Sequence, residues 1–180
     1  MATIFTHPAV ALGLSPFFSS VLKSKTVLFA GAVLTIIPDI DVVGFRLGIP
    51  YEHILGHRGI THSLFFAVIF SGVVARFIIN PVKTNFFQLW VYLFLCMGSH
   101  GVLDALTNGG HGIAFFAPFM NERYFFPFTP IEVSTLNIRH FFQGQGLAVI
   151  KSELIWAWIP FLIVFIVGFS CVKILNKRSD

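Results

Sequence analysis

The sequence predicts an all-α membrane protein, a polytopic bundle of about five transmembrane helices, with four as the smaller alternative. Hydrophobic residues make up 56% of its 180 residues and charged residues only 11%, against about 25% charged in an ordinary soluble domain. So few charges cannot cover a water-exposed surface, and the lipid bilayer is therefore the expected partner of most of this surface. The length fits a single integral membrane domain over residues 1–180.

Three apolar runs are long enough to cross a bilayer as helices. They cover residues 63–79, 86–106 and 155–175, and each approaches the roughly 20 residues that a transmembrane helix needs. We expect these three runs to form the clearest spans of the bundle, with residues 155–175 as the last transmembrane helix.

Two further apolar runs precede them and are interrupted by proline. Residues 4–22 contain Pro8 and Pro16, and residues 26–37 end at Pro38. At about 1.5 Å per residue, the second run covers only about 18 Å of a bilayer core about 30 Å thick. It therefore either continues through residues 38–45 or stops inside the membrane. In both cases the carboxylates that follow Pro38 lie below the membrane surface.

Lys and Arg side chains are expected to set the orientation of the bundle. The formal net charge is +4, and three groups of basic residues share one side of the expected topology: Lys23, Lys25, Arg76, Lys83, Lys173, Lys177 and Arg178. The positive-inside rule places them in the cytoplasm, with the N-terminus outside and the C-terminus inside. The chain has no basic run interleaved with aromatic residues, so nucleic acid is not an expected partner.

Six of the seven histidines and three of the four aspartates fall on the opposite, extracytoplasmic face within the first 111 residues. With Glu52 and Arg58 they form this group: His7, Asp39, Asp41, Glu52, His53, His57, Arg58, His62, His100, Asp104 and His111. Ionisable groups at membrane depth are costly and tend to mark function. The one-sided distribution therefore predicts a functional site at this face.

His100 and Asp104 are four residues apart and fall on one face of a helix. An imidazole nitrogen and a carboxylate oxygen at this spacing can chelate zinc. The alternative is a helix-terminal His–Asp hydrogen bond without a metal.

The segment from His57 to Ser63 has the sequence His-Arg-Gly-Ile-Thr-His-Ser. Its glycine and Gly56 permit tight turns, and Thr61 or Ser63 is expected to cap the following helix. Arg58 suits recognition of an anion, because its guanidinium can bind a phosphate through two parallel hydrogen bonds. The alternative is an interfacial loop with incidental histidines.

Asp39 and Asp41 stand two residues apart at the expected end of a helix. The helix dipole disfavours negative charge at a helix C-terminus, and a nearby metal cation removes this conflict. Several other chemistries lack their motifs, because the chain contains no His-Glu-x-x-His, no Gly-x-Ser-x-Gly and no phosphate-binding Gly-Lys-Ser/Thr loop.

These motifs resemble those of the LexA-regulated, inner-membrane metal-dependent hydrolase family of bacteria, the YdjM-like family. The resemblance rests on four segments within residues 1–112: Thr6-His7, Pro38-Asp39-Ile-Asp41, His57 to Ser63, and His100-x-x-Leu103-Asp104-x-x-Thr107. It implies a hydrolase of the bacterial inner membrane that depends on a divalent metal. Zinc is the expected ion, manganese or magnesium are alternatives, and one or more ions are expected.

The order of these residues is also similar, more distantly, to the zinc-dependent phospholipase C and single-strand nuclease superfamily. Carried over by order, that likeness implies the following metal ligands: His7, Asp39 or Asp41, His57 or His62, His100, Asp104 and His111. Two departures are visible. The chain begins Met1-Ala2 where that superfamily begins with a metal-binding Trp, and Gly144 stands four residues after His140 where an acid is expected.

A long outer-face segment, residues 107–152, is rich in aromatic residues and is expected to form a lid or re-entrant segment beside the site. Arg123 and Arg139 lie within it and are expected to bind the phosphate of the substrate. Plain aromatic anchoring at the membrane interface is the alternative role of its Phe residues.

The sequence thus predicts a membrane-embedded hydrolase that cleaves a phosphoester, in a lipid or a lipid-linked substrate, with metal-activated water. Arg58 is expected to hold the phosphate, with Glu52 or His53 as acid or base. Two rival functions remain. One is a metal-binding transporter or a membrane protein without enzymatic activity, and the other is hydrolysis of an amide or a carboxylic ester.

Overall fold

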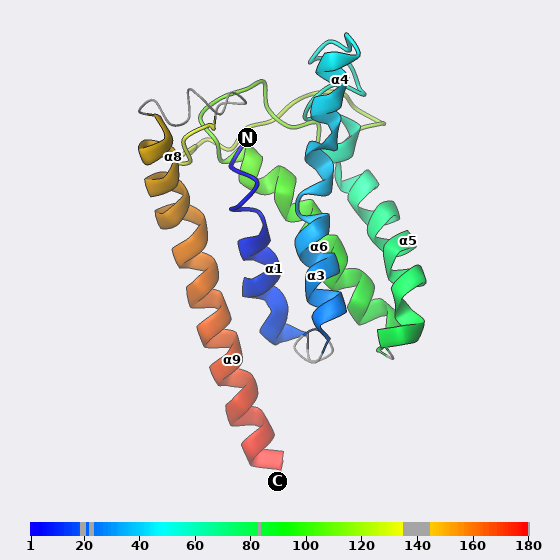
Figure 1. Ribbon diagram of the computed structural model, residues 1–180, viewed down its shortest axis with the longest axis vertical. Helices are drawn as coiled ribbons and strands as arrows, with labels where there is room; N and C mark the ends of the chain where they lie inside the picture. The colour runs from blue at the N-terminus through cyan, green and yellow to red at the C-terminus, as the bar shows by residue number, and fades with distance from the viewer. Residues whose placement is uncertain (19–20, 22–23, 83, 135–144, 180) are drawn as a thin grey trace.

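The computed structural model describes the chain except residues 19–20, 22–23, 83, 135–144 and 180. Long helical columns stand side by side, with the N-terminus at one end of the bundle and the C-terminus at the other (Figure 1). The described residues contain no β-strand and only two isolated bridges, Thr107 with Ile131 and Ile113 with Tyr124. The expected all-α membrane bundle is confirmed.

The helices follow one another in five columns. The first is α1 (Pro8–Leu14) with the short 3₁₀ turn η1 (Ser15–Phe17), and the second is α3 (Lys25–Leu34), η2 (Ile37–Val42) and α4 (Val43–Arg46). A short turn, η3 (Ile60–His62), precedes α5 (Leu64–Val82) and α6 (Phe86–Ala105). The last column is α8 (Gly146–Glu153), a π-helical turn η5 (Leu154–Trp158) and α9 (Ile159–Ser179).

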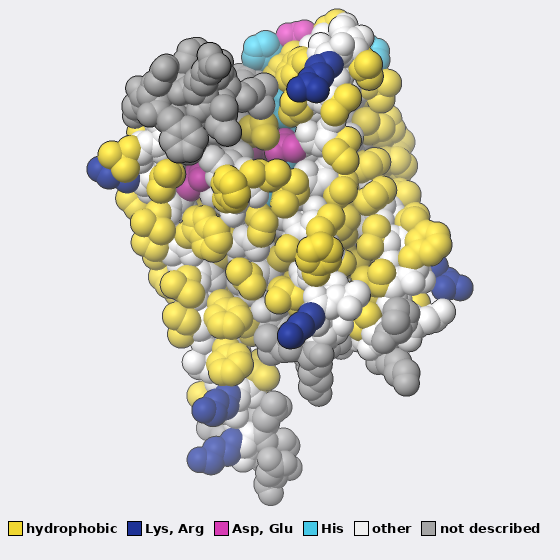
Figure 2. All heavy atoms as spheres, in the orientation of Figure 1, with side chains coloured by type: hydrophobic (Ala, Val, Ile, Leu, Met, Phe, Trp, Pro, Cys, Tyr) yellow, Lys and Arg dark blue, Asp and Glu magenta, His cyan; other side chains and the backbone are white. Residues whose placement is uncertain are grey.

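Among the described residues, three columns are long and apolar enough to cross a membrane: Lys25–Arg46, Phe86–Ala105 and Gly146–Leu175. Two shorter apolar helices, Pro8–Phe17 and Leu64–Asn80, lie beside them. A belt of hydrophobic side chains covers the middle of the molecule, as Figure 2 shows, whereas acidic and histidine side chains appear only towards its upper end. This distribution agrees with a bundle whose flank is covered by lipid.

The sequence left open whether the second helix continues past Pro38 or stops there inside the membrane. The helix does not stop inside the membrane, because it continues as η2 and α4 to Arg46. Pro38 is accommodated in the first turn of η2, where its missing N–H has no intrahelical partner to lose. Asp39 and Asp41 are therefore carried on a helical segment within the bundle.

Polar side chains mark the starts of three helices. The Ser24 hydroxyl accepts a hydrogen bond from the Val27 amide, and the Asn85 side chain accepts one from Gln88. Ser63, rather than Thr61, caps α5, because its Oγ accepts a hydrogen bond from the Phe66 amide at 3.1 Å. Each cap satisfies an amide in the first turn of a helix, where no intrahelical acceptor is available.

The first and last columns depart from the expected bounds. Among the described residues, the first helix covers Pro8–Phe17 and begins four residues after the expected start at residue 4. The expected end of this run, residue 22, lies outside the described residues. The last column begins at Gly146, nine residues before the expected start at residue 155. Residues 146–152 of the expected lid or re-entrant segment therefore belong to a helix, and the helix continues through Glu153, which is buried against the N-terminal segment.

The core lies where α3, α5 and α6 pack, and α1 joins it between α3 and α9. Tyr92 of α6 is fully buried, and its hydroxyl donates a hydrogen bond to the Ala11 carbonyl of α1 at 3.0 Å. Gly31 of α3 faces this ring so closely that a Cβ there would lie 2.7 Å from the Tyr92 hydroxyl. Small residues thus let the helix backbones approach, as membrane helices commonly require.

Substituting Gly31→Ala should destabilise the bundle by roughly 1–3 kcal/mol, because the added methyl group overlaps the buried Tyr92 ring. The matched control is Gly98→Ala in α6, where the new Cβ meets its nearest side-chain atom at 3.8 Å. Thermal unfolding of both variants in detergent, followed by circular dichroism, measures the difference. Equal melting temperatures for the two variants would contradict the tight packing of α3 against Tyr92.

Candidate metal centre

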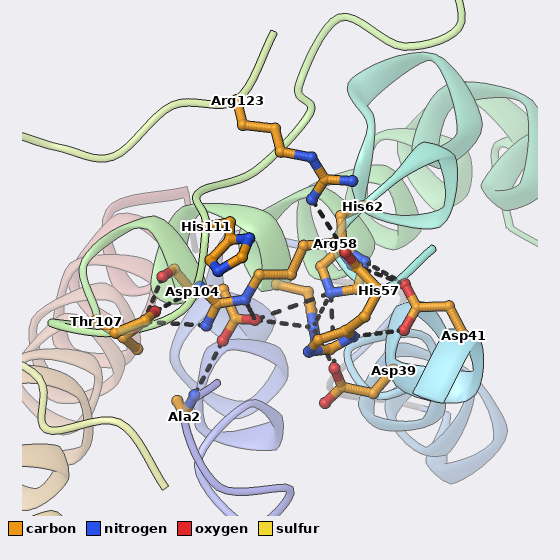
Figure 3. A network of polar contacts seen from close by, with 12 residues as sticks. Ala2, Asp39, Asp41, His57, Arg58, His62, Asp104, Thr107, His111 and Arg123 are labelled. Atoms are coloured by element: carbon orange, nitrogen blue, oxygen red, sulfur yellow. Dashed lines mark hydrogen bonds and ion pairs between the residues drawn. The ribbon is translucent and has the colours of Figure 1, made fainter. Parts of the chain in front are cut away.

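Four segments far apart in sequence converge at the upper end of the bundle. They are the N-terminal residues, the end of the second column, the loop of residues 47–63 and the end of α6 (Figures 1 and 3). The loop is folded tightly on itself. A Cβ at Gly59 would lie 2.3 Å from the Ile54 carbonyl oxygen, so glycine is required there for the close backbone approach.

A cluster of four residues lies at this convergence and offers metal-ligating atoms within 4.8 Å of one another: Asp39, His62, His100 and Asp104. The two imidazole Nε2 atoms are 3.0 Å apart. The Asp39 Oδ1 atom lies 3.6 Å from His62 Nε2 and 3.3 Å from His100 Nε2. The Asp104 Oδ2 atom lies 3.8 and 3.9 Å from the same two nitrogens.

The two histidines are oriented by their other ring nitrogens. His100 Nδ1 lies 2.7 Å from the Thr35 carbonyl oxygen, an acceptor, so this nitrogen carries the proton. His62 Nδ1 lies 3.1 Å from Asp41 Oδ2. Hydrogen bonds of this kind fix the tautomer and leave Nε2 as the ligating atom. Both Nε2 atoms therefore face the carboxylates of the cluster.

The donor atoms fit a cation in both number and spacing. Asp39 Oδ1, Asp39 Oδ2 and Asp104 Oδ2 are buried and receive no hydrogen bond from the described residues. Buried polar atoms without partners are rare and call for an explanation. In a tetrahedral zinc site with bonds of about 2.0–2.2 Å, donor atoms lie roughly 3.3–3.6 Å apart. The five distances given above, which involve at least one imidazole nitrogen each, run from 3.0 to 3.9 Å and bracket that range.

The electrostatics of the cluster also favour a positive charge. Burial by itself lowers the pKa of His62, but the carboxylates of Asp39 and Asp41 outweigh it and raise this pKa to about 9. The same carboxylates would attract a metal ion in competition with the proton. The negative charge of these buried carboxylates would therefore be offset by a bound cation.

His7 lies against the cluster from the N-terminal side. Its ring stacks on His100, with the ring centroids 3.9 Å apart, and its Nε2 atom lies 3.9 Å from Asp104 Oδ1. The residue is fully buried, and neither ring nitrogen has a hydrogen-bond partner among the described residues. Burial without hydrogen bonds is unfavourable for an imidazole, which makes His7 a further candidate ligand.

Asp41 contacts the histidines on the side away from the clustered Nε2 atoms. Its Oδ1 atom lies 2.7 Å from His57 Nδ1, and its Oδ2 atom accepts hydrogen bonds from the Thr61 hydroxyl at 2.7 Å and the Arg58 amide at 3.0 Å. Together with the contact to His62 Nδ1, these partners occupy both oxygens. Asp41 therefore orients the two histidines, although Asp41, His57 and His62 also lie close enough to share an ion.

Arg58 is buried and its guanidinium is engaged by groups of the protein. Its Nε atom lies 3.1 Å from Asp104 Oδ2, and its other nitrogens donate to the Thr107 hydroxyl at 3.0 Å and the Gly109 carbonyl at 2.8 Å (Figure 3). Only 1% of the residue is exposed. These contacts make Arg58 a support for Asp104, which differs from the phosphate-binding role expected from the sequence.

The remaining candidates lie on the periphery. His111 and Glu52 face each other at 3.1 Å with their side chains 58% and 69% exposed, and His53 Nδ1 accepts a hydrogen bond from the Leu55 amide. Arg123 donates to the carbonyls of Tyr51 and His57 and so caps the loop. None of these four joins the cluster, and Arg139 lies outside the described residues.

The sequence motifs gave no indication of several supporting groups. The Ala2 amide donates a hydrogen bond to Asp104 Oδ1 at 2.9 Å, and the Thr35 carbonyl accepts the His100 proton. Contacts of backbone amides and carbonyls cannot be predicted from the pattern of residue types, because every residue carries these groups. Thr107 was visible in the quoted motif, three residues after Asp104, and its hydroxyl connects Arg58 to the Asp104 carbonyl.

The fold and the site together define a polytopic helical membrane protein with a buried His/Asp cluster at one end. Comparison with known sequences gives the family: the YdjM inner membrane protein family matches residues 1–177, and the chain belongs to it. This match extends beyond residues 1–112, where the motifs of the resemblance lie. The chain is also similar to the inner membrane protein YbcI of Escherichia coli (strain K12), with 35% identity over 160 residues.

That alignment covers 89% of this chain and 92% of the relative, so the two proteins correspond over nearly their whole length. No solved structure matches the chain. The resemblance to the YdjM-like family is confirmed, whereas the more distant likeness to the phospholipase C and nuclease superfamily is not shown by these comparisons.

The geometry predicts about one divalent ion per chain in detergent-purified protein, lost in the double variant His100→Ala/Asp104→Ala, which removes two of the four clustered ligands. His111→Ala should keep the ion, because His111 lies outside the cluster. Elemental analysis by mass spectrometry measures the metal content. Wild-type protein without metal, and without stabilisation when zinc or manganese is added back, would count against a metal centre.

Proposed function

We propose that this protein is a membrane-embedded, metal-dependent hydrolase that cleaves a phosphoester of a lipid or lipid-linked substrate. The observation that carries the proposal is the cluster of two imidazoles and two carboxylates at one end of an apolar bundle, in which three carboxylate oxygens receive no hydrogen bond from the described residues. Buried ionisable groups in a membrane protein are costly and mark functional sites.

Asp39, His62, His100 and Asp104 would hold the ion, and His7 is placed to add a ligand. Zinc suits this mixture of nitrogen and oxygen donors, with manganese or magnesium as alternatives. A bound divalent ion supplies a Lewis acid and lowers the pKa of water to about 7. Arg58 and the Ala2 amide hold the Asp104 carboxylate in place through one oxygen each.

His57 is the residue best placed to move a proton. Its Nδ1 atom is held by Asp41 at 2.7 Å, which leaves Nε2 as a proton acceptor, and its ring centroid lies 5.5 Å from that of His62. A carboxylate behind an imidazole orients the ring and stabilises its charged form. Glu52 and His53, the acid or base expected from the sequence, are exposed and lie outside the cluster.

Two observations favour an enzyme over a transporter. A transporter is expected to bind its ion near the bilayer midplane, with polar groups on both sides. Here the cluster sits at one end of the bundle, and Figure 2 shows no acidic or histidine side chain in the lower half of the visible face. Hydrolysis of an amide or a carboxylic ester remains the second candidate, because metal-activated water also attacks carbonyl carbons.

Hydrolysis should be measurable with purified protein in vesicles of phosphatidylethanolamine and phosphatidylglycerol supplied with zinc. We expect phosphorylated headgroups among the products, no turnover after chelation, and a loss of about 10²- to 10⁴-fold in kcat for His57→Gln with the metal retained. Mass spectrometry identifies the products. The control is Arg46→Gln, at the end of α4.

The products also separate the rival functions. Free fatty acid in place of phosphorylated headgroups would support cleavage of a carboxylic ester. No product in any arm, with the metal bound, would count against an enzyme and favour a metal-binding membrane protein without hydrolase activity.

The proposed hydrolase would act on the extracytoplasmic side. Lys25 begins α3 and Lys173 and Lys177 lie in the final turns of α9, at the end of the bundle away from the cluster (Figure 1). The positive-inside rule places that end in the cytoplasm.

A reporter fused after the C-terminus tests this orientation. Green fluorescent protein should be fluorescent there and alkaline phosphatase inactive, since the former matures only in the cytoplasm and the latter only outside it. The reverse pattern would place the cluster in the cytoplasm while leaving the chemistry of the metal centre unaffected.

A further inference from the structure

A second buried carboxylate lies outside the metal cluster. Glu153 ends α8 and is only 4% exposed, although it belongs to the candidate span Gly146–Leu175. It accepts hydrogen bonds from the Thr3 amide, from the Thr3 hydroxyl at 2.7 Å and from the Thr6 hydroxyl at 2.8 Å. Among the described residues it forms no ion pair. Among the described residues, its negative charge therefore has hydrogen-bond donors and an electrostatic interaction with the Met1 ammonium, but no ion-pair partner within 4 Å.

A pocket of about 380 Å³ opens beside this carboxylate, and its walls include Phe5, Thr6, Leu154 and Trp158. The Trp158 indole N–H donates a hydrogen bond to the Thr6 hydroxyl at 3.2 Å, so the hydroxyl that binds Glu153 also positions the indole. The helix is π-helical over Leu154–Trp158, a local widening that often occurs at functional sites.

The pocket is open to the bilayer. Phe5 is 78% exposed, and Ile150 and Leu154, on the helix that forms the other wall, are about half exposed. In a membrane protein these apolar side chains contact lipid. An occupant of the pocket would therefore arrive from the membrane.

We propose that this pocket binds the ammonium group of a phospholipid headgroup. A carboxylate offers about four acceptor positions, and three of those on Glu153 are used by the two threonines. The remaining position and the negative charge, which has no ion-pair partner among the described residues, attract a cation. The aromatic rings of Phe5 and Trp158 add cation–π attraction, the interaction by which proteins recognise quaternary ammonium groups. A headgroup without an ammonium would lack both interactions.

The pocket adjoins the metal centre through the N-terminal segment. Consecutive amides reach the two carboxylates, because the Ala2 amide donates to Asp104 and the Thr3 amide donates to Glu153. Consecutive amide nitrogens are at most roughly 3.6 Å apart, so the two carboxylates lie within roughly 10 Å of each other. If the proposed hydrolase function holds, a lipid anchored here would bring its phosphate close to the metal; the ammonium site itself does not depend on that function.

Lipid binding to the detergent-purified full chain tests the site by native mass spectrometry. The probes are dioleoyl phosphatidylethanolamine, phosphatidylcholine and phosphatidylglycerol, which share their acyl chains. We expect the two ammonium lipids to bind about tenfold more tightly than phosphatidylglycerol. Preference for phosphatidylethanolamine alone would indicate hydrogen bonds from a primary ammonium to Glu153, whereas preference for both would indicate the aromatic rings; each supports the site.

Glu153→Gln removes the charge and keeps one oxygen that can accept the hydrogen bonds of the Thr3 and Thr6 hydroxyls, although it loses the acceptor of the Thr3 amide. We expect this variant to abolish the preference. The matched control, Glu122→Gln, changes an exposed carboxylate and should preserve it. Phe5→Leu provides a second test with little risk to folding, because Phe5 is largely exposed; it should weaken phosphatidylcholine binding most.

An unchanged preference in both Glu153→Gln and Phe5→Leu, or no preference in the wild type, would overturn the ammonium site. Because the readout is binding, a failure of the proposed hydrolysis would leave these results unaffected, and the two proposals can fail separately.

Discussion

Negative charge buried at one end of an apolar bundle is the constraint on which the upper half of this structure depends. Asp39 and Asp104 place carboxylates within reach of two imidazoles, and three of their oxygens receive no hydrogen bond from the part of the chain that the structure describes. A buried carboxylate is costly unless it is paired or coordinates a metal. The surrounding contacts can be understood as ways of supplying positive charge, hydrogen bonds and rigidity to this cluster.

Arg58 and Asp41 provide much of that rigidity. Arg58 contacts both sides of the site, since its amide donates to Asp41 and its guanidinium pairs with Asp104. To do so it adopts a positive φ of 62°, a conformation that is unfavourable for residues other than glycine and persists only when surrounding contacts enforce it. The flanking residues His57 and His62 are then held by Asp41. One loop thus couples the orientation of two histidines to that of a carboxylate on another helix.

The N-terminal segment connects the candidate metal centre to the lipid-facing side of the molecule. Its Ala2 and Thr3 amides reach Asp104 and Glu153 in succession, and the His7 ring stacks on His100. The segment thereby fixes the last column against the end of α6. An enzyme acting on lipid would need such a connection, because its reacting groups are polar while its substrate lies in the bilayer. The family match over residues 1–177 agrees with a site that draws on both halves of the chain.

The sequence by itself determined the all-α membrane class, the positions of α5 and α6 within a few residues, and the gathering of His and Asp residues at one end. Composition and helical spacing carry this information because lipid excludes charge and a helix repeats every 3.6 residues. Tertiary structure alone decided which of these residues meet. It brought Asp39, His62, His100 and Asp104 together and left His111, Glu52 and His53 on the periphery. It turned Arg58 towards Asp104 and extended the last helix through Glu153. The physical reason is that the direction and burial of a side chain depend on its partners, which come from distant segments or from the backbone. The Thr35 carbonyl that binds His100 is one such backbone group. The pattern of residue types along the chain contains no information about which of these partners a side chain meets.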